Sequence, residues 1–243
     1  MIDIPGRILI TGTDTGVGKT VVTAALADCI IKSGLEVNAV KPFQTGTEET
    51  AVTDIEFVYR VLGRTFDIEK ACPHRLKKPL SPFYAAKLEN INYRKSDIVS
   101  TVENSMDENC INLVEGAGGL KVPITKNYYM SDFAKDMELK LIVAARPGLG
   151  TVNHTLLTID HAKSQGLDIM GIVISGYPKR PDLAESTNIP QLAELTDIEI
   201  LGIIPELDNL DVEMGQTGKL AEKSRDFFIN GLGGNLNINK FLT

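Results

Sequence analysis

The chain has 243 residues, of which 43% are apolar and 23% charged, a composition typical of a globular protein rather than of a disordered, fibrous or repetitive one. Because a single core stops growing at about 250 to 300 residues, the length favours one domain. Lys and Arg total 25 against 32 Asp and Glu, and the net charge of −7 argues against a general nucleic-acid binder or a protein that lies on an anionic membrane.

The cysteines and the first residues bear on location. Cys29, Cys72 and Cys110 have no paired spacing, so neither a disulfide framework nor a cysteine zinc site is expected. The first residues lack the basic and apolar regions of a secretory signal, and no window approaches the roughly 18 apolar residues of a spanning helix. We therefore expect a cytoplasmic protein with no membrane and no nucleic-acid partner.

Apolar runs and turn residues predict alternating strands and helices. Strands are expected over 7–11, 37–40, 111–114, 139–145, 169–174 and 199–204. Helices are expected over 19–33 and 53–63 and near 131–137, 151–165 and 183–196. Continuous apolar strands that alternate with helices are typical of an α/β fold with a mainly parallel sheet and helices on both faces.

Two segments fall outside this pattern. Residues 71–96 contain three prolines and several basic residues, and we expect a long irregular connection of the kind that often serves as a lid. The Gly- and Asn-rich tail over 230–239 is expected to be mobile or to form a late crossover. Residues 1–243 are thus predicted to form a single domain, with 208–243 as a C-terminal segment of undetermined role.

The strongest motif joins the first predicted strand to the first predicted helix. Residues 12–20 are Gly-Thr-Asp-Thr-Gly-Val-Gly-Lys-Thr, with the first glycine one position earlier than in the usual phosphate loop. In such a loop the backbone N–H groups surround phosphate oxygens, Lys19 reaches the β and γ phosphates, and the Thr20 hydroxyl ligates Mg²⁺. The motif predicts a P-loop NTPase-like nucleotide site, and the chain has no Asn-Lys-x-Asp run of the kind that reads guanine.

Three charged residues at predicted strand ends and helix starts are candidates to serve the phosphates. Glu115 ends a strand and is followed by glycines, which suits a Mg²⁺ ligand, although it can also be an ordinary strand-terminal acid. Asp54 stands in a first helical turn, where a structural role toward the helix dipole is an equal alternative. Lys41 ends the second strand, at the edge where α/β sheets bind ligands, or it is a solvated loop lysine.

A helix start later in the chain offers another anion site. The free N–H groups after Gly150 suit a carboxylate. Alternatively, Thr151 or Asn153 simply caps this helix.

Taken in order, the motifs between about residues 7 and 207 resemble those of the dethiobiotin synthetase family. They are the phosphate loop at 12–20, Lys-Pro-x-x-x-Gly at 41–46, the acid Asp54, Ser81-Pro82, Glu-Gly-Ala-Gly-Gly at 115–119, Gly-x-x-Asn-His at 150–154 and Gly-Ile-Ile-Pro at 202–205. The combination is specific to the family, whereas each motif alone is not.

The resemblance implies an enzyme of biotin synthesis that joins CO₂ to 7,8-diaminopelargonate with ATP and Mg²⁺, giving dethiobiotin, ADP and phosphate. One amine captures CO₂ as a carbamate, the carbamate oxygen attacks the γ phosphate, and the second amine closes a cyclic urea as phosphate leaves. Because this chemistry needs no covalent protein nucleophile, the protein's part is positioning and charge stabilisation.

The resemblance also implies roles for individual positions. Lys19 and Lys41 are the implied catalytic residues, and Thr20, Asp54 and Glu115 the implied Mg²⁺ ligands. The nucleotide is expected to contact Gly16, Val17, Gly18, Lys19, Thr20, Val21, Asp54, Glu115, Gly116, Ala117, Gly118, Ser175, Gly176, Pro205, Glu206 and Leu207. The diamine and carbamate are expected to contact Thr15, Lys41, Thr45, Gly150, Thr151, Val152 and Asn153, the last four supplied by the second subunit of a homodimer with shared active sites.

Two positions depart from the family pattern. Ser175 stands where the family often has an Asn that contacts adenine, and a hydroxyl lacks the paired donor and acceptor of an amide. Ser186 stands where some members have a Tyr near the substrate carboxylate. The departures leave base selectivity and diamine affinity open.

Two other functions remain as alternatives. A dimeric switch ATPase of the partitioning class shares the phosphate loop, but such loops characteristically carry a Lys where this chain has Asp14. A sister P-loop amidoligase of the cobalamin type shares the loop and the strand-end acids. The chain has no catalytic-looking Cys near a Gly-rich elbow, which argues against a self-sufficient amidotransferase.

Overall fold

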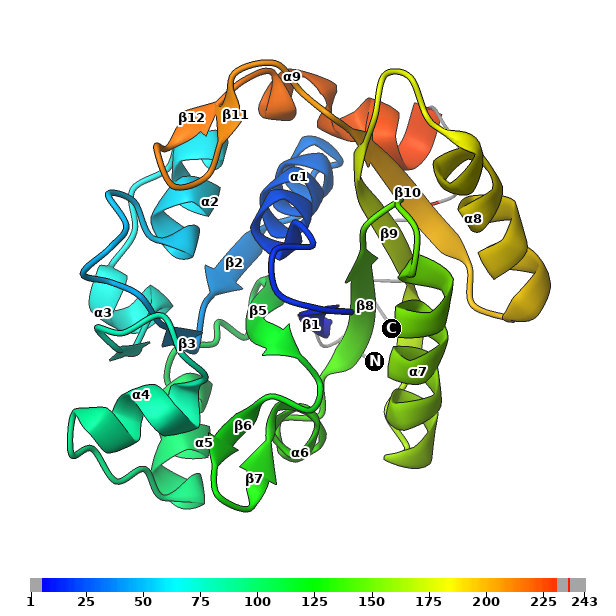
Figure 1. The fold of residues 1–243 in the computed structure, drawn as a ribbon. Helices are drawn as coiled ribbons and strands as arrows, with labels where there is room; N and C mark the ends of the chain where they lie inside the picture. The colour runs from blue at the N-terminus through cyan, green and yellow to red at the C-terminus, as the bar shows by residue number, and fades with distance from the viewer. Residues whose placement is uncertain (1–5, 231–235, 237–243) are drawn as a thin grey trace.

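The computed structural model describes residues 6–230 and residue 236, which form a parallel sheet with helices on both faces (Figure 1). The sheet has the strand order β10-β9-β8-β1-β5-β2, and every neighbouring pair is parallel. Its strands are β1 (Arg7–Gly12), β2 (Val37–Val40), β5 (Ile111–Gly119), β8 (Lys140–Ala145), β9 (Ile169–Tyr177) and β10 (Ile200–Pro205). The predicted α/β fold is confirmed, and each predicted strand is present.

The strands are buried on both faces because successive side chains of a strand point to opposite sides. In β1, Ile8 and Ile10 pack into the core on one face of the sheet, whereas Leu9 packs into the core on the other face. In β8, Ile142 and Val143 likewise pack into the core on opposite faces of the sheet. This arrangement explains why the strands are continuous apolar runs in the sequence.

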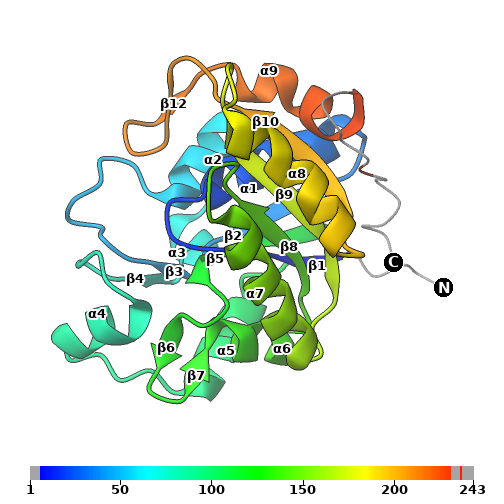
Figure 2. The same cartoon turned by 45° about the vertical axis from the view of Figure 1, so that its right-hand side comes forward.

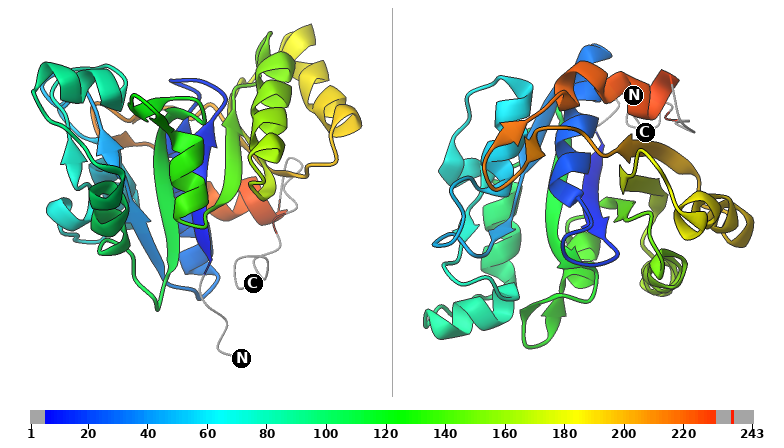
Figure 3. Two further views of the ribbon diagram at one scale, coloured as in Figure 1. Left: turned by 90° about the horizontal axis from the view of Figure 1, so that it is seen from below. Right: turned by 45° about the horizontal axis from the view of Figure 1, so that its top comes forward.

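The helices form one layer on each face of the sheet. One layer holds α1 (Lys19–Lys32), α2 (Asp54–Leu62) and α9 (Leu220–Arg225), and the other holds α5 (Lys95–Glu103), α6 (Met130–Asp136), α7 (Thr151–Ser164) and α8 (Leu183–Leu195). Figure 2 shows α7 and α8 in front of the sheet, and Figure 3 gives two further directions of view. Together with the sheet, the two layers make a single α/β domain.

Residues 71–96 contain regular structure that the sequence analysis did not predict. After α3 (Ile68–Ala71), the short strand β4 (His74–Arg75) pairs in parallel with β3 (Phe43–Gln44), and α4 (Pro82–Leu88) follows. The expectation of an irregular connection is therefore wrong for these residues. Pro82 occupies the first helical position after Ser81, a placement typical of helix starts, because its missing N–H has no intrahelical partner there.

The segment after Leu207 packs against the nucleotide-loop helix. It forms a hairpin of β11 (Leu210–Asp211) and β12 (Gln216–Thr217) and then α9, which lies beside α1 in every view (Figures 1, 2 and 3). The Ser224 hydroxyl donates to the carboxylate of Asp28 in α1, and the Lys32 ammonium lies 2.7 Å from the same carboxylate. Most of the tail predicted over 230–239 lies outside the described residues.

A second hairpin, β6 (Pro123–Thr125) with β7 (Tyr128–Tyr129), follows β5. Within residues 6–230, no helix has the length and apolar character needed to cross a bilayer.

The packing of the C-terminal segment generates the first prediction. Phe228 is fully buried, and a Cβ atom placed on Gly202 of β10 would lie 2.6 Å from its ring, so the ring occupies the space that the glycine leaves open. We expect Phe228→Ala to lower the free energy of unfolding by about 3–5 kcal/mol, because it removes buried apolar surface and leaves a cavity. Urea unfolding measures the loss.

Leu183→Ala is the matched control, since that side chain is 80% exposed and its loss should change stability by less than about 0.5 kcal/mol. Equal effects of the two substitutions would show that the C-terminal segment is not part of the cooperative core.

Candidate functional site

The phosphate loop connects β1 to α1 at the carboxyl edge of the sheet. Gly18 has a left-handed backbone with φ of 87°, and a Cβ atom there would lie 2.3 Å from the hydroxyl oxygen of Ser175. A Cβ atom on Gly12 would lie 2.6 Å from the carbonyl oxygen of Asp14 and 3.0 Å from Lys19 Nζ. Gly12, the early glycine of the motif, is therefore needed because a side chain there would clash with the loop. Lys19 Nζ donates to the Asp14 carbonyl oxygen at 3.2 Å.

Two cavities adjoin this loop, one on each side. The larger, about 730 Å³, contains Lys41 and is called the Lys41 cavity; the other, about 480 Å³, contains Ser175 and is called the Ser175 cavity. Of the predicted site residues, the Lys41 cavity is lined by Thr15, Lys19, Thr20, Lys41, Thr45, Asp54, Glu115, Ala117 and Gly118, and the Ser175 cavity by Val17, Ser175, Gly176, Pro205, Glu206 and Leu207. Gly16, Gly18 and Val21 line both. The structure thus places these residues in two groups that share the loop, whereas the predicted residues Gly116 and 150–153 line neither cavity.

Lys41 lies between two carboxylates at the floor of its cavity. Its Nζ atom is 2.6 Å from Asp54 Oδ2 and 2.7 Å from Glu115 Oε1, and it also donates to the Gly116 carbonyl at 3.3 Å. The Thr20 hydroxyl donates to Glu115 Oε1 at 2.9 Å. The sheet register explains why Lys41 and Glu115 lie together, because Val40 of β2 pairs with Val114 of β5 and these two residues come next.

Burial and charge act in opposite directions on this cluster. Burial alone would lower the pKa of Lys41, but the two carboxylates outweigh it and hold that pKa above its usual range. Burial would raise the pKa of Asp54, yet Lys41 and Lys19 lower it below normal. Glu115 is so deeply buried that its pKa is raised in spite of Lys41. Lys41 is therefore a permanent cation, paired most firmly with Asp54.

Lys19 has a different electrostatic state. Burial, and then the charge of Lys41, lowers its pKa from 10.5 to about 8. Free Lys19 is thus about half neutral near pH 8. Phosphate groups beside it would favour the charged form and raise that pKa again.

The same cluster has the donor set of a Mg²⁺ site. Glu115 Oε2 is buried and has no hydrogen-bond partner, so one carboxylate oxygen is left for a further ligand. Mg²⁺ is bound in nucleotide sites by one or two carboxylates together with phosphate and water. The described residues contain no group of three or more His, Cys, Asp or Glu side chains that could hold a metal without such help.

The contacts of Asp54 fit both of its predicted roles. Thr53 and Glu56 form the capping box of α2, with the Thr53 N–H donating to Glu56 at 2.7 Å. The Asp54 carboxylate instead pairs with Lys41, and its backbone N–H donates to Gln44 Oε1 at 3.2 Å. Asp54 lies in the first turn of α2, as the predicted role toward the helix dipole requires, and its carboxylate also belongs to the charged cluster.

The start of α7 lies apart from both cavities. Residues 150–153 line neither of them, and the helix begins at Gly150 without a side-chain cap, so the alternative that Thr151 or Asn153 caps it is wrong. Asn188 of α8 holds the preceding turn by donating to the carbonyls of Pro147 and Gly148 at 2.8 and 3.1 Å. Within one chain, this predicted anion site is not brought to the charged cluster.

Several lining residues carried no signal that the sequence analysis used. Gln44 is buried under the Lys41 cavity, and Glu213 reaches the same cavity from the hairpin after β10. Arg146 and Lys179 line the Ser175 cavity. Arg146 directly follows a predicted strand, so its place at the carboxyl edge could have identified it.

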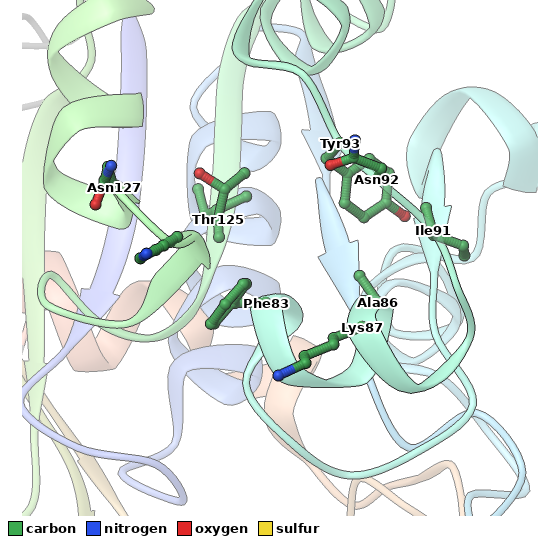
Figure 4. Close-up of a pocket in the computed structure, with 10 residues that line it drawn as sticks. Phe83, Ala86, Lys87, Ile91, Asn92, Tyr93, Thr125 and Asn127 are labelled. Atoms are coloured by element: carbon green, nitrogen blue, oxygen red, sulfur yellow. The ribbon is translucent and has the colours of Figure 1, made fainter.

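A third cavity, about 350 Å³, lies between α4 and the β6–β7 hairpin (Figure 4). Figure 4 shows Phe83 and Lys87 of α4 on one side of it and Thr125 and Asn127 of the hairpin on the other. None of its lining residues is acidic or belongs to the phosphate loop. This cavity therefore lacks the combination of phosphate loop and carboxylates that the Lys41 cavity has.

The comparisons with known proteins agree with this geometry. A family model described as an AAA domain matches residues 6–214. An ATP-dependent dethiobiotin synthetase of Bacillus velezensis is 38% identical over 205 residues, covering 84% of this chain and 88% of that protein. The corresponding synthetase of Thermodesulfovibrio yellowstonii is 38% identical over 89% of this chain and 95% of its own length.

The chain belongs to the ATP-dependent dethiobiotin synthetase family. A relative from Methanococcus vannielii, 35% identical over 85% of this chain and 97% of its own, carries the same name. The resemblance seen in the motifs is thereby confirmed.

Solved structures support the fold alone. The cell-division complex MinC:MinD of Aquifex aeolicus gives a TM-score of 0.55 at 18% identity, covering 90% of this chain and 94% of that chain. A ParA-family ATPase of Chlorobium tepidum gives 0.54 at 12% identity, with 90% and 98% covered. This chain thus shares its fold with these two proteins.

The lowered pKa of Lys19 generates a prediction about proton uptake. With a pKa of about 8, Lys19 is about nine-tenths neutral at pH 9, whereas the phosphates of a nucleotide are fully ionised there. Because bound phosphates favour the charged amine, ATP binding at pH 9 should take up close to one proton, and much less at pH 7. Calorimetric titrations in buffers of different ionisation enthalpy measure this uptake.

Lys19→Arg is the control, because a guanidinium stays charged over this range and should abolish the uptake. Observed heats that do not depend on the buffer at pH 9 in the unsubstituted protein would contradict the assignment.

Proposed function

We propose that this chain uses ATP to close a cyclic urea on 7,8-diaminopelargonate with CO₂, giving dethiobiotin, ADP and phosphate, the reaction for which its family is named. One neutral amine forms a carbamate with CO₂ and loses a proton. The carbamate oxygen attacks the γ phosphorus as ADP leaves, and the second amine then attacks the carbamate carbon and expels phosphate. The observation that carries the proposal is the Lys41–Asp54–Glu115 cluster beside the phosphate loop, at the floor of an open cavity.

Lys41 and Lys19 supply the positive charge that this chemistry needs. The carbamate and the transferring phosphoryl group are both anionic, and fixed cations in a site shielded from water stabilise them strongly. Lys41 is held as a cation by two carboxylates, and Lys19 begins α1 at the loop. Thr15 and Thr45 line the same cavity and offer hydroxyl groups to the diamine and the carbamate.

Thr20, Asp54 and Glu115 are the residues that would hold Mg²⁺. When bound there, the metal would neutralise charge on the nucleotide phosphates. The unpartnered Oε2 atom of Glu115 supports this assignment. Lys41 pairs with the same two carboxylates, so Lys41 and a metal ion compete for them.

A homodimer completes the site in this proposal. The diamine substrate carries a carboxylate, and the free N–H groups at the start of α7 suit such a group. Because residues 150–153 line neither cavity of their own chain, they would serve a second copy of the chain. Leu149, beside this helix start, is 84% exposed, which suits burial against a partner.

The first experiment measures phosphate release from Mg-ATP and bicarbonate, with and without 7,8-diaminopelargonate, and follows dethiobiotin by mass spectrometry. Phosphate release should depend on the diamine and should equal dethiobiotin formation, because transfer to the carbamate precedes ring closure. Slow release that ignores the diamine would contradict the proposed substrate while leaving the nucleotide site intact.

Lys41→Ala tests the role of the charged cluster. We expect it to lower diamine-dependent product formation by about 10²- to 10³-fold, the usual effect of removing one group that stabilises transition-state charge. Binding of Mg-ADP should change less than tenfold, and the Mg²⁺ concentration needed for it should fall, because Lys41 no longer competes for the two carboxylates. Calorimetry measures both quantities.

Lys77→Ala is the matched control, since the Lys77 side chain is 63% exposed and lines neither cavity. If Lys41→Ala unfolds the chain, the double variant with Glu115→Gln removes the unpaired buried charge. Unchanged product formation in either Lys41 variant would remove Lys41 from the reaction.

A further inference from the structure

We propose that the Ser175 cavity does not select one nucleobase, so that this chain accepts purine and pyrimidine nucleoside triphosphates alike as phosphoryl donors. The proposal rests on the proposed function in taking this cavity as the place of the base, beside the phosphate loop. It concerns the base only, because the phosphates lie against the shared loop in every case.

The side chains that line the cavity offer no matched donor and acceptor pair. Among its described lining residues none is Asn or Gln, the two side chains that present an N–H₂ and a carbonyl oxygen side by side. Ser175 stands at the end of β9, and its hydroxyl oxygen packs against Gly18 of the phosphate loop. A short hydroxyl held in this place gives at most a single hydrogen bond to a base.

The backbone of Pro205 and Glu206 supplies no free donor. Pro205 has no N–H group. The N–H of Glu206 donates to the carbonyl oxygen of Tyr177 at 2.8 Å, so it is already used within the sheet. Pro205 and Glu206 therefore present backbone acceptors to the cavity but no free backbone donor.

The remaining polar groups do not favour one base. Lys179 and Asp208 pair with each other at 2.6 Å across the rim, which satisfies both charges. Arg146 only donates, and Glu206 only accepts. Carbonyl or ring-nitrogen acceptors and N–H donors occur on all four common bases, so each base can meet the same two kinds of partner. No lining side chain presents a donor and an acceptor side by side.

Apolar contact is the other means of holding a base here, and it is not directional. Val17 and Val21 of the loop and helix face Leu207 and Leu210 of the segment after β10. Such contact scales with the area buried and not with the hydrogen-bonding pattern of the ring. Affinity for the triphosphate then depends mainly on the loop and on Lys19.

The test on the unsubstituted protein compares ATP, GTP, CTP and UTP, with inorganic tripolyphosphate as the ligand without a base. Mg²⁺-dependent binding is measured by calorimetry, and diamine-dependent phosphate release gives kcat/KM for each nucleotide. We expect the four dissociation constants, and the four kcat/KM values, to lie within about tenfold of one another. A preference for ATP of a hundredfold or more in binding would overturn the proposal.

The two proposals fail in different ways. Equal binding of all four nucleotides without diamine-dependent release would contradict the proposed function and would leave the inference on base selection intact. Diamine-dependent phosphate release with ATP and with no other nucleotide would support the proposed function and contradict the inference on base selection.

Ser175→Asn supplies the missing amide. We expect it to raise the ratio of ATP to UTP affinity by about five- to 150-fold, the range for one good bidentate contact to a base. Ser175→Ala is the matched variant, and it should keep the ratios among nucleotides near those of the unsubstituted chain. A strong ATP preference that Ser175→Ala abolishes would show that the serine itself reads adenine, against the proposal.

If Ser175→Asn does not fold, as judged by circular dichroism, the comparison of nucleotides on the unsubstituted protein decides alone.

Discussion

The buried ammonium group of Lys41 is the interaction on which the site depends. It lies within 2.7 Å of carboxylates that come from the start of α2 and from β5, and Lys41 itself follows β2. Charges removed from water are stable only when each is paired, and the loss of one partner leaves the others uncompensated. The parallel pairing of β2 with β5 and the position of α2 are therefore constrained by the chemistry as well as by the apolar core.

The two lysines of the cavity have different electrostatic roles because their partners differ. Lys41 has two carboxylates, which hold its pKa above its usual range and keep it charged. Lys19 has only a backbone carbonyl at 3.2 Å as its hydrogen-bond acceptor, and its burial brings its pKa to about 8. One lysine is thus a fixed positive charge, whereas the other would become fully charged only beside phosphate groups. A site of this kind holds its shape without ligand and still responds to it.

The sequence predicts the frame of the fold because each buried strand is an apolar run and each carries its motif at its end. It does not predict β3, β4 and α4, which are too short for periodicity to reveal, or the packing of α9, which depends on the pair Ser224–Asp28 across the chain. Within the site, the pairing of β2 with β5 is enough to predict that Lys41 and Glu115 lie close together. The side-chain partner of Asp54 could not be predicted, because an acid in a first helical turn suits the helix dipole and a ligand set equally well until Lys41 is seen beside its carboxylate. The roles of individual residues remain predictions.

The phosphate loop is the common wall of the two cavities, with Gly16, Gly18 and Val21 facing both. In the proposed function the nucleoside lies in the Ser175 cavity and the diamine in the Lys41 cavity, so the phosphates would lie along the loop that the two cavities share. One loop thus serves both sides of the site, and a substitution of Gly16, Gly18 or Val21 would disturb both cavities together.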